Sequence, residues 1–317
     1  MQHRSRQRTE IIGIIALLLA DIIWGNAFVA QVSGMSSLSP LAFNAVRFLI
    51  GALSLVFLLF LPSSRRSRPQ SKDAWRKIFH ASFIAGALLF GAMTCEQIGI
   101  NCLRNAGESA FLNSLSILFL PLIALFYGKK IGSKFLWAVL LNAVGVYLLA
   151  FDGGTGVRPT WKDLLFIGSS LFYGIQTFYI ERAVQEVNVI HLAFGEVTVA
   201  AILSWISVFL FHLQPSMHAV SLALVPLLYT GVLSSCGAYS LQLIGQKSVP
   251  AEPASIIMSL NTLFSVIGGD LILHETMNWY GYCGCILMLV GTIIADTMES
   301  DESTPLTPSS QGSKALV

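Results

Sequence analysis

The chain has 317 residues, of which 54% are hydrophobic and only 11% are charged, and its formal net charge is +2. A soluble domain carries about 25% charged residues, so this composition excludes an ordinary soluble protein. The net charge alone excludes little. The apolar residues fall in blocks of about 20, the length at which a helix spans the hydrocarbon core of a bilayer. These blocks lack the alternation of a membrane barrel, so the sequence predicts an all-α, multi-pass membrane protein.

Ten membrane-spanning helices are expected in chain order. They cover residues 11–32, 40–61, 78–100, 105–127, 134–151, 161–180, 190–211, 220–243, 250–273 and 279–297. The first block follows a basic start, at residues 1–10, and is too long for the apolar core of a signal peptide. The linkers leave no room for a soluble domain. The polar tail at 298–317 lacks aromatic residues and is expected to be disordered.

The distribution of lysine and arginine predicts the orientation. With the N-terminus in the cytoplasm, the outer loops hold only Arg104, Arg158 and Lys162, Arg47 lies within a span, and the other basic residues lie inside. Cytoplasmic loops of membrane proteins carry such an excess. Both termini are therefore expected on the cytoplasmic side of the cell (inner) membrane.

The two halves of the chain share short matches in the same order. The matched pairs are Trp24-Gly25 with Tyr173-Gly174, Leu41-Ala-Phe43 with Leu192-Ala-Phe194, Gly86 and Gln97 with Gly231 and Gln242, Glu108 and Ala110 with Glu252 and Ala254, and Val144-Gly145 with Val290-Gly291. They predict two five-helix repeats, at 11–151 and 161–297. Because five is odd, the second repeat is inverted, as in many secondary transporters. Inversion puts Glu108 and Glu252 near opposite faces, so we interpret both as helix-start residues favoured by the helix dipole.

Some of these residues resemble a known family over about residues 10–297. They are Trp24-Gly25, Arg47, Ala110 followed by Pro121, and the loop before the last span of each half. In these the chain resembles the drug/metabolite transporter superfamily, in the form built from two EamA-type modules. It departs from the pattern at Gly128-Lys129 and His274-Glu275, where the family has Gly-Glu, and at Thr198, which replaces the arginine in the second half. The resemblance implies a carrier of small metabolites, amino acids, nucleotide-like compounds or drugs.

Charged residues within predicted spans need a reason, because charge is costly in a bilayer. Asp21 is expected near the midplane, where it could bind a cationic group, exchange a proton or pack against Asn142. Arg47 and Glu96 are both expected in the outer third, as a structural ion pair or as contacts to a solute. Glu196 has no basic residue at a similar depth, and Asp270 lies near an outer end.

The resemblance implies that the first, third and fourth spans of each half line a central cavity. Aromatic faces with a few amides suit a flat or amphipathic solute, although amides also bond between helices. The candidate substrate-binding residues are Asp21, Trp24, Asn26, Glu96, Asn113, Tyr173, Gln176, Tyr239 and Asn261.

Other functional signals fail. The glycine-rich Asp152–Gly156 lacks the lysine of a phosphate loop, the five cysteines are interpreted as packing residues, and the basic loop from Arg65 to Lys77 is explained by orientation.

We expect no enzyme activity, cofactor, metal or nucleic-acid partner. The predicted function is secondary transport of a small organic metabolite, amino-acid-like, nucleoside-like or a drug, by alternating access, as export or exchange. The alternatives are an uptake carrier or antiporter and, more remotely, a membrane enzyme or scaffold. The partners are the solute, the bilayer and, in a homodimer, a second copy.

Overall fold

The structure, a computed structural model, describes residues 2–60, 69–103, 109–110, 112–113, 132–150, 163–273 and 279–297. Most of the predicted span at 105–127 lies outside these residues, together with Glu108 and Pro121. The loops at Gly128-Lys129 and His274-Glu275, the glycine-rich turn and the tail at 298–317 lie outside as well, as does the side chain of Glu252.

Helices make up all the regular structure of the described residues. They are α1 (Gln2–Gly34), α2 (Pro40–Leu59), α4 (Lys72–Leu103), α7 (Ser133–Ala150), α8 (Asp163–Glu186), α9 (Val189–Leu210), α10 (Met217–Leu222), α11 (Leu224–Leu228), η1 (Tyr229–Ala238), α12 (Tyr239–Gln246), α13 (Ala251–Met258), α14 (Asn261–Gly268), η2 (Gly269–Leu273) and α15 (Trp279–Thr297). These elements occupy the predicted apolar blocks, apart from the block at 105–127.

Six helical stretches of the described chain are long and apolar enough to cross a membrane. Four lie in α1, α2, α4 and α9, and the others run over Leu224–Gln246 and Pro253–Ile272. Large apolar side chains face outward, for example Phe57, Phe79 and Trp279, which are 76%, 71% and 75% exposed. Such side chains suit contact with lipid. The chain is therefore a helical protein with several apolar spans, and the full number of ten spans stays a prediction.

Local capping explains where two of the spans begin. The Ser39 side chain accepts a hydrogen bond from the Ala42 backbone N–H, and Pro40 occupies the first position of α2. The Asn188 side chain accepts from the backbone N–H groups of Ile190 and His191 at the start of α9. Both arrangements satisfy N–H groups that have no partner within the helix.

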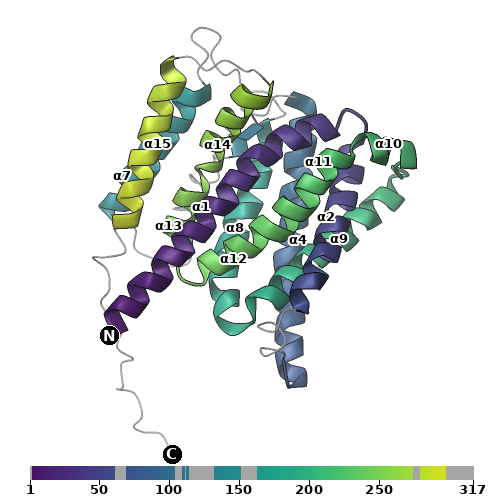
Figure 1. Cartoon of the computed structure of the whole chain (residues 1–317), viewed down its shortest axis with the longest axis horizontal. Helices are drawn as coiled ribbons and strands as arrows, with labels where there is room; N and C mark the ends of the chain where they lie inside the picture. The colour runs from purple at the N-terminus through teal and green to yellow at the C-terminus, as the bar shows by residue number, and fades with distance from the viewer. Residues whose placement is uncertain are drawn as a thin grey trace, which may run out of the picture.

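Small residues allow α1 and α4 to approach their neighbours closely. Helix α1 runs diagonally across the molecule, while α7 and α15 lie side by side at one edge (Figure 1). A Cβ atom added at Gly25 on α1 would lie 2.5 Å from the Phe264 Cβ atom on α14, and one at Gly86 on α4 would lie 2.6 Å from the Glu196 carbonyl oxygen on α9. Small residues at such contacts are typical of membrane helices.

Two irregular stretches interrupt the second half. Residues Tyr229–Ala238 form the π-helix η1. A two-residue turn at Ser259 and Leu260 separates α13 from α14. The Ser259 hydroxyl lies 2.6 Å from the Ile256 carbonyl oxygen and 2.9 Å from Asn142 Oδ1, so its single hydrogen is shared between them. Both irregular stretches present residues to a cavity among the helices.

Candidate functional site

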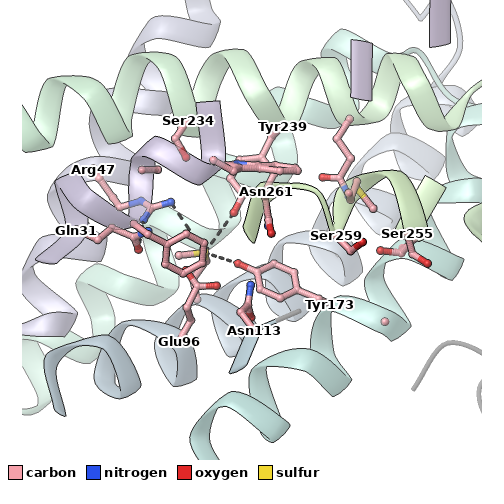
Figure 2. A pocket seen from close by; sticks show the side chains of 18 residues that line it. Gln31, Arg47, Glu96, Asn113, Tyr173, Ser234, Tyr239, Ser255, Ser259 and Asn261 are labelled. Atoms are coloured by element: carbon pink, nitrogen blue, oxygen red, sulfur yellow. Dashed lines mark hydrogen bonds between the residues drawn. The ribbon is translucent and has the colours of Figure 1, made fainter. Parts of the chain in front are cut away.

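The cavity among the helices has about 740 Å³ of unfilled space, part of it open to solvent. It is bordered by α1, α2, α4, α8, η1, α12, α13 and α14, so both halves of the chain contribute (Figure 2). The lining residues are Trp24, Ala27, Phe28, Gln31, Arg47, Met93, Glu96, Asn113, Tyr173, Gly174, Thr177, Ser234, Tyr239, Gln242, Ser255, Met258, Ser259 and Asn261.

One end of the cavity is charged. Arg47 Nη1 donates a hydrogen bond of 3.0 Å to Gln31 Oε1, and the Gln31 side chain also interacts with Glu96. Arg47, Gln31 and Glu96 are nearly fully buried, at 1%, 2% and 3% exposure. The charged side chains of Arg47 and Glu96 do not approach within 4.0 Å of one another, unlike Lys77 and Glu186, which form an ion pair at 3.5 Å. Arg47 and Glu96 nevertheless interact electrostatically, and Gln31, which can both accept and donate, interacts with both of them.

Polar hydrogens gather on a sulfur atom at the same end. Met93 Sδ accepts from the Tyr173 hydroxyl at 2.5 Å, from the Tyr239 hydroxyl at 3.2 Å and from Arg47 Nη2 at 3.9 Å (Figure 2). The Asn44 side chain holds the Met93 backbone by donating to its carbonyl oxygen at 2.9 Å. A charged donor and two phenols thus share one thioether, which is a weak acceptor.

Aromatic rings form the middle of the cavity. The Trp24 and Tyr239 rings meet edge to face, with centroids 5.2 Å apart and planes at 62°. Tyr173 lies between Glu96 and the far end in the view of Figure 2. These rings offer flat apolar surface with polar atoms at their edges.

The far end is polar but uncharged. Ser255 and Ser259 lie there, with Asn261 and Asn113 nearer the middle (Figure 2). Asn113 is fixed by α8, because the Ser169 and Ser170 hydroxyls donate to its side-chain and backbone oxygens at 3.3 and 3.2 Å. The cavity can therefore accommodate an amphipathic molecule whose charged groups lie near Arg47 and Glu96.

The EamA family model matches residues 11–151 and 160–295, which together make up most of the chain. The chain belongs to the EamA-like transporter family. A membrane transporter is thus the general class of this protein.

Individual relatives of this EamA-like transporter agree with that class. An "Uncharacterized transporter" of Archaeoglobus fulgidus is 27% identical over 281 residues, covering 88% of this chain and 84% of that protein. The "Uncharacterized transporter YoaV" of Bacillus subtilis is 23% identical over 287 residues, covering 89% and 94% of the two chains. A protein crystal structure with 19% identity matches with a TM-score of 0.72 over 94% of this chain and 99% of that one, which shows a shared fold.

Most of the predicted site residues of this EamA-like transporter converge on the cavity. Trp24, Glu96, Asn113, Tyr173, Tyr239 and Asn261 all line it. Three predicted residues, Asp21, Asn26 and Gln176, do not appear in the lining. Asn26 donates to the Ile22 carbonyl oxygen at 2.9 Å, within its own helix. Gln176 is fully buried and donates to Glu196 Oε1 at 2.6 Å.

Asp21 is completely buried, and neither of its carboxyl oxygens has a hydrogen-bond partner among the residues that the structure describes. The predicted packing against Asn142 is wrong as a polar contact, because the Asn142 side chain instead donates to Ala138 and accepts from Ser259. A buried carboxyl group without a donor is costly when ionised. Asp21 is thus a candidate for holding a proton rather than for touching a solute.

Several polar residues that line the cavity were not predicted from the sequence. Gln31 follows Trp24 by seven residues, and Ser255 precedes Ser259 by four, so helical spacing places each pair on one face. That spacing could have found Gln31. Ser234 and Gln242 lie in and after the π-helix η1, where the ordinary helical period does not hold. The described residues contain no group of three or more His, Cys, Asp or Glu side chains that could hold a metal ion.

Proposed function

We propose that this EamA-like protein is a secondary transporter that moves a small organic solute through the cavity by alternating access. The observation that carries the proposal is the composition of the cavity. It combines one cationic, one anionic, several aromatic and several amide or hydroxyl side chains around a single cavity. Solute sites in proteins are concave, largely apolar and fitted with a few polar groups.

The cavity also lies between the two halves of the chain, as alternating access requires. Its walls include α1, α2 and α4 from residues 11–151 and α8, η1, α12, α13 and α14 from residues 161–297. A site between two inverted repeats can open to each side in turn when one repeat rocks against the other. We propose this mechanism, with ten spans in two inverted five-helix repeats.

The remaining parts of the proposal come from the sequence. The protein lies in the cell (inner) membrane with both termini in the cytoplasm, works as a monomer or homodimer, and binds neither a cofactor nor nucleic acid. The solute is amino-acid-like, nucleoside-like or a drug, and the flux is export or exchange, driven by the solute gradient, by exchange or by protons. Arg47 and Glu96 have opposite charges, so the cavity favours a neutral or zwitterionic solute over a simple ion.

Counterflow in proteoliposomes tests this proposal. Vesicles with the purified full-length protein are loaded with unlabelled phenylalanine, leucine, alanine, uridine or ethidium, and entry of the same labelled compound is followed. The expected result is transient accumulation of at least one compound, saturable and absent from empty vesicles. No counterflow of any compound, together with a chemical conversion of one of them, would support the membrane-enzyme alternative instead.

A further inference from the structure

The π-helix η1 determines which side chains of its stretch line the cavity. Ser234, in η1, and Tyr239, at the start of α12, both border the cavity and lie along one side of it in Figure 2. They are five residues apart in the sequence, a spacing that in an α-helix would leave them about 140° apart around the axis. The Tyr239 backbone N–H bonds to the Ser234 carbonyl oxygen, which is the i to i+5 spacing of a π-helix. The π form therefore brings both side chains to the cavity.

The backbone of η1 is supported in a way that allows its helical form to change. Compared with an α-helix, a π-helix holds one surplus residue in each hydrogen-bonded turn, and runs longer than a single turn are rare. Side-chain hydroxyls bond to carbonyl oxygens in and around η1: Thr230 to Pro226 at 2.8 Å, and Ser235 to Thr230 at 2.8 Å. Ser240 bonds to the Cys236 carbonyl oxygen at 2.6 Å. These carbonyl groups keep a partner when backbone N–H bonds change between the π and α patterns, as a helix in lipid requires.

Close contacts hold the helix on both sides of this stretch. A Cβ atom added at Gly231, near the start of η1, would lie 3.0 Å from the Arg47 carbonyl oxygen on α2. A Cβ atom added at Gly245, near the end of α12, would lie 2.9 Å from the Gly13 carbonyl oxygen on α1. With both ends held in this way, a shift of the surplus residue along the helix turns the residues between the two contacts and leaves the ends in place.

We propose that η1 is a register switch, whose surplus residue moves along the helix between the Gly231 and Gly245 contacts as the cavity changes access. In the form seen here, Ser234 and Tyr239 both face the cavity, and Tyr239 meets the Trp24 ring. When the residues before Tyr239 adopt the α form, the Tyr239 side chain turns by about 100°, the angle of one α-helical residue, and leaves Trp24. This inference rests on the transport function proposed above and specifies a moving part of the cavity wall.

A one-residue deletion tests the switch. Removing Gly237 takes away the surplus residue and brings Ser234 and Tyr239 to a spacing of four, so a plain α-helix presents both to the cavity. Ligand-induced thermal stabilisation and counterflow are measured for phenylalanine, uridine and ethidium with the full-length protein. A compound that stabilises the wild type should stabilise the deletion variant to a similar extent. Its counterflow should fall by roughly tenfold or more, because alternating access needs the conformational step.

Two outcomes of the deletion would overturn the inference. Wild-type counterflow in the folded variant would show that transport does not need the surplus residue. Loss of ligand-induced stabilisation would show that the α form does not present Ser234 and Tyr239 to the cavity. Gly237→Ala is the matched control, because it keeps the chain length, and it should show wild-type counterflow. An equal loss in Gly237→Ala would assign the effect to the glycine instead of the surplus residue and would contradict the switch.

Hydrogen exchange tests the same inference without a solute and without relying on the deletion variant. Amide exchange in the full-length wild type is followed by mass spectrometry and compared between η1 and the residues of α4 around Met93. Met93 lines the same cavity from a regular helix, so access of water is matched. Amides of η1 should exchange roughly tenfold or more faster than those of α4, because their hydrogen bonds open during each change of register. Equal exchange in the two stretches would overturn the inference.

Failure of this inference and failure of the transport proposal give different results. Counterflow in the wild type together with unchanged counterflow in the deletion variant would keep transport and remove the switch. Fast exchange confined to η1 in a protein that shows no counterflow of any compound would contradict transport and leave the change of helical form intact.

Discussion

The indole ring of Trp24 and the phenol ring of Tyr239 meet edge to face across the cavity wall, with centroids 5.2 Å apart. Trp24 lies on α1 in the first half of the chain, and Tyr239 lies on α12 in the second half. The contact therefore joins the two predicted repeats at the site where the solute is proposed to bind. A rocking motion of one repeat against the other would alter this contact directly.

Removing the Trp24 ring should weaken solute binding. Trp24→Ala deletes an aromatic face that borders the cavity, and such aromatic contacts are worth about 0.5–1.5 kcal/mol. We expect the dissociation constant of the best-bound solute to rise roughly two- to tenfold, measured by titration calorimetry. Trp137→Ala is the control, because Trp137 on α7 is 61% exposed and lies away from the cavity. An equal loss in both variants would exclude a specific role for Trp24.

The close approach of α1 and α14 predicts a large effect of a small substitution. Gly25→Val would place a Cβ atom 2.7 Å from the Asn261 carbonyl oxygen and 2.5 Å from the Phe264 Cβ atom. Overpacking of this kind costs about 1–3 kcal/mol, so the melting temperature in detergent should fall.

A second glycine serves as the control for Gly25. Apart from its chain neighbours and the nearby backbone of its own helix, a Cβ atom added at Gly237 would come within 4 Å only of the Val232 carbonyl oxygen, at 3.7 Å, among the described residues. Gly237→Ala should leave the free energy of unfolding unchanged or raise it by up to about 1 kcal/mol. The melting temperature should therefore stay the same or rise. A Gly25→Val protein as stable as the wild type would show that α1 and α14 do not pack closely.

The hydrogen bond between Gln176 and Glu196 should matter for stability rather than for solute selection. Gln176→Leu leaves the buried Glu196 carboxyl without its 2.6 Å donor, which should cost about 1–3 kcal/mol. Replacing both residues by leucine should recover much of this loss, because apolar pairs of similar shape leave no polar group unpaired. A double-mutant cycle of melting temperatures measures the coupling, and simple additivity would contradict it.

Asp21 should affect coupling but not solute affinity. Asp21→Asn removes an ionisable group that is fully buried and has no hydrogen-bond partner within the described part of the chain. We expect the fold and the solute affinity to persist and the pH dependence of counterflow to flatten, because a buried ionisable residue in a span commonly exchanges a proton. Asp270→Asn provides an exposed carboxylate control. An unchanged pH profile in Asp21→Asn would contradict the proton role. A large loss of solute affinity would instead indicate that Asp21 contacts the solute.

The sequence predicted much of the helical pattern because apolar block length is a direct consequence of bilayer thickness. The predicted segment at 190–211 corresponds to α9 at Val189–Leu210, and the one at 279–297 to α15 at Trp279–Thr297. Capping residues such as Asn188 fix the helix starts locally. These features depend on composition and on neighbouring residues alone, so they can be read without the fold.

The site was harder to predict because it depends on helix rotation. Trp24 and Tyr239 were found as polar-edged rings in the expected spans, but Gln176 turns toward Glu196 instead of the cavity. The π-helix η1 changes the rotation of the helical residues within and after it. For this reason Ser234 and Gln242 were not predicted to line the cavity. The role of Gln31 between Arg47 and Glu96 was not predicted either, because depth along a helix says nothing about which side chain fills the space between two charges.

The central claim is that a solute is transported through this cavity. Its most direct test is solute counterflow through the reconstituted protein, measured for the wild type and for Trp24→Ala over a range of solute concentrations. If the solute passes through this cavity, we expect saturable counterflow of at least one neutral or zwitterionic solute, with a higher half-saturating concentration in Trp24→Ala and an unchanged value in Trp137→Ala. Counterflow that does not saturate, or that is the same in wild type and Trp24→Ala, would contradict transport through this cavity.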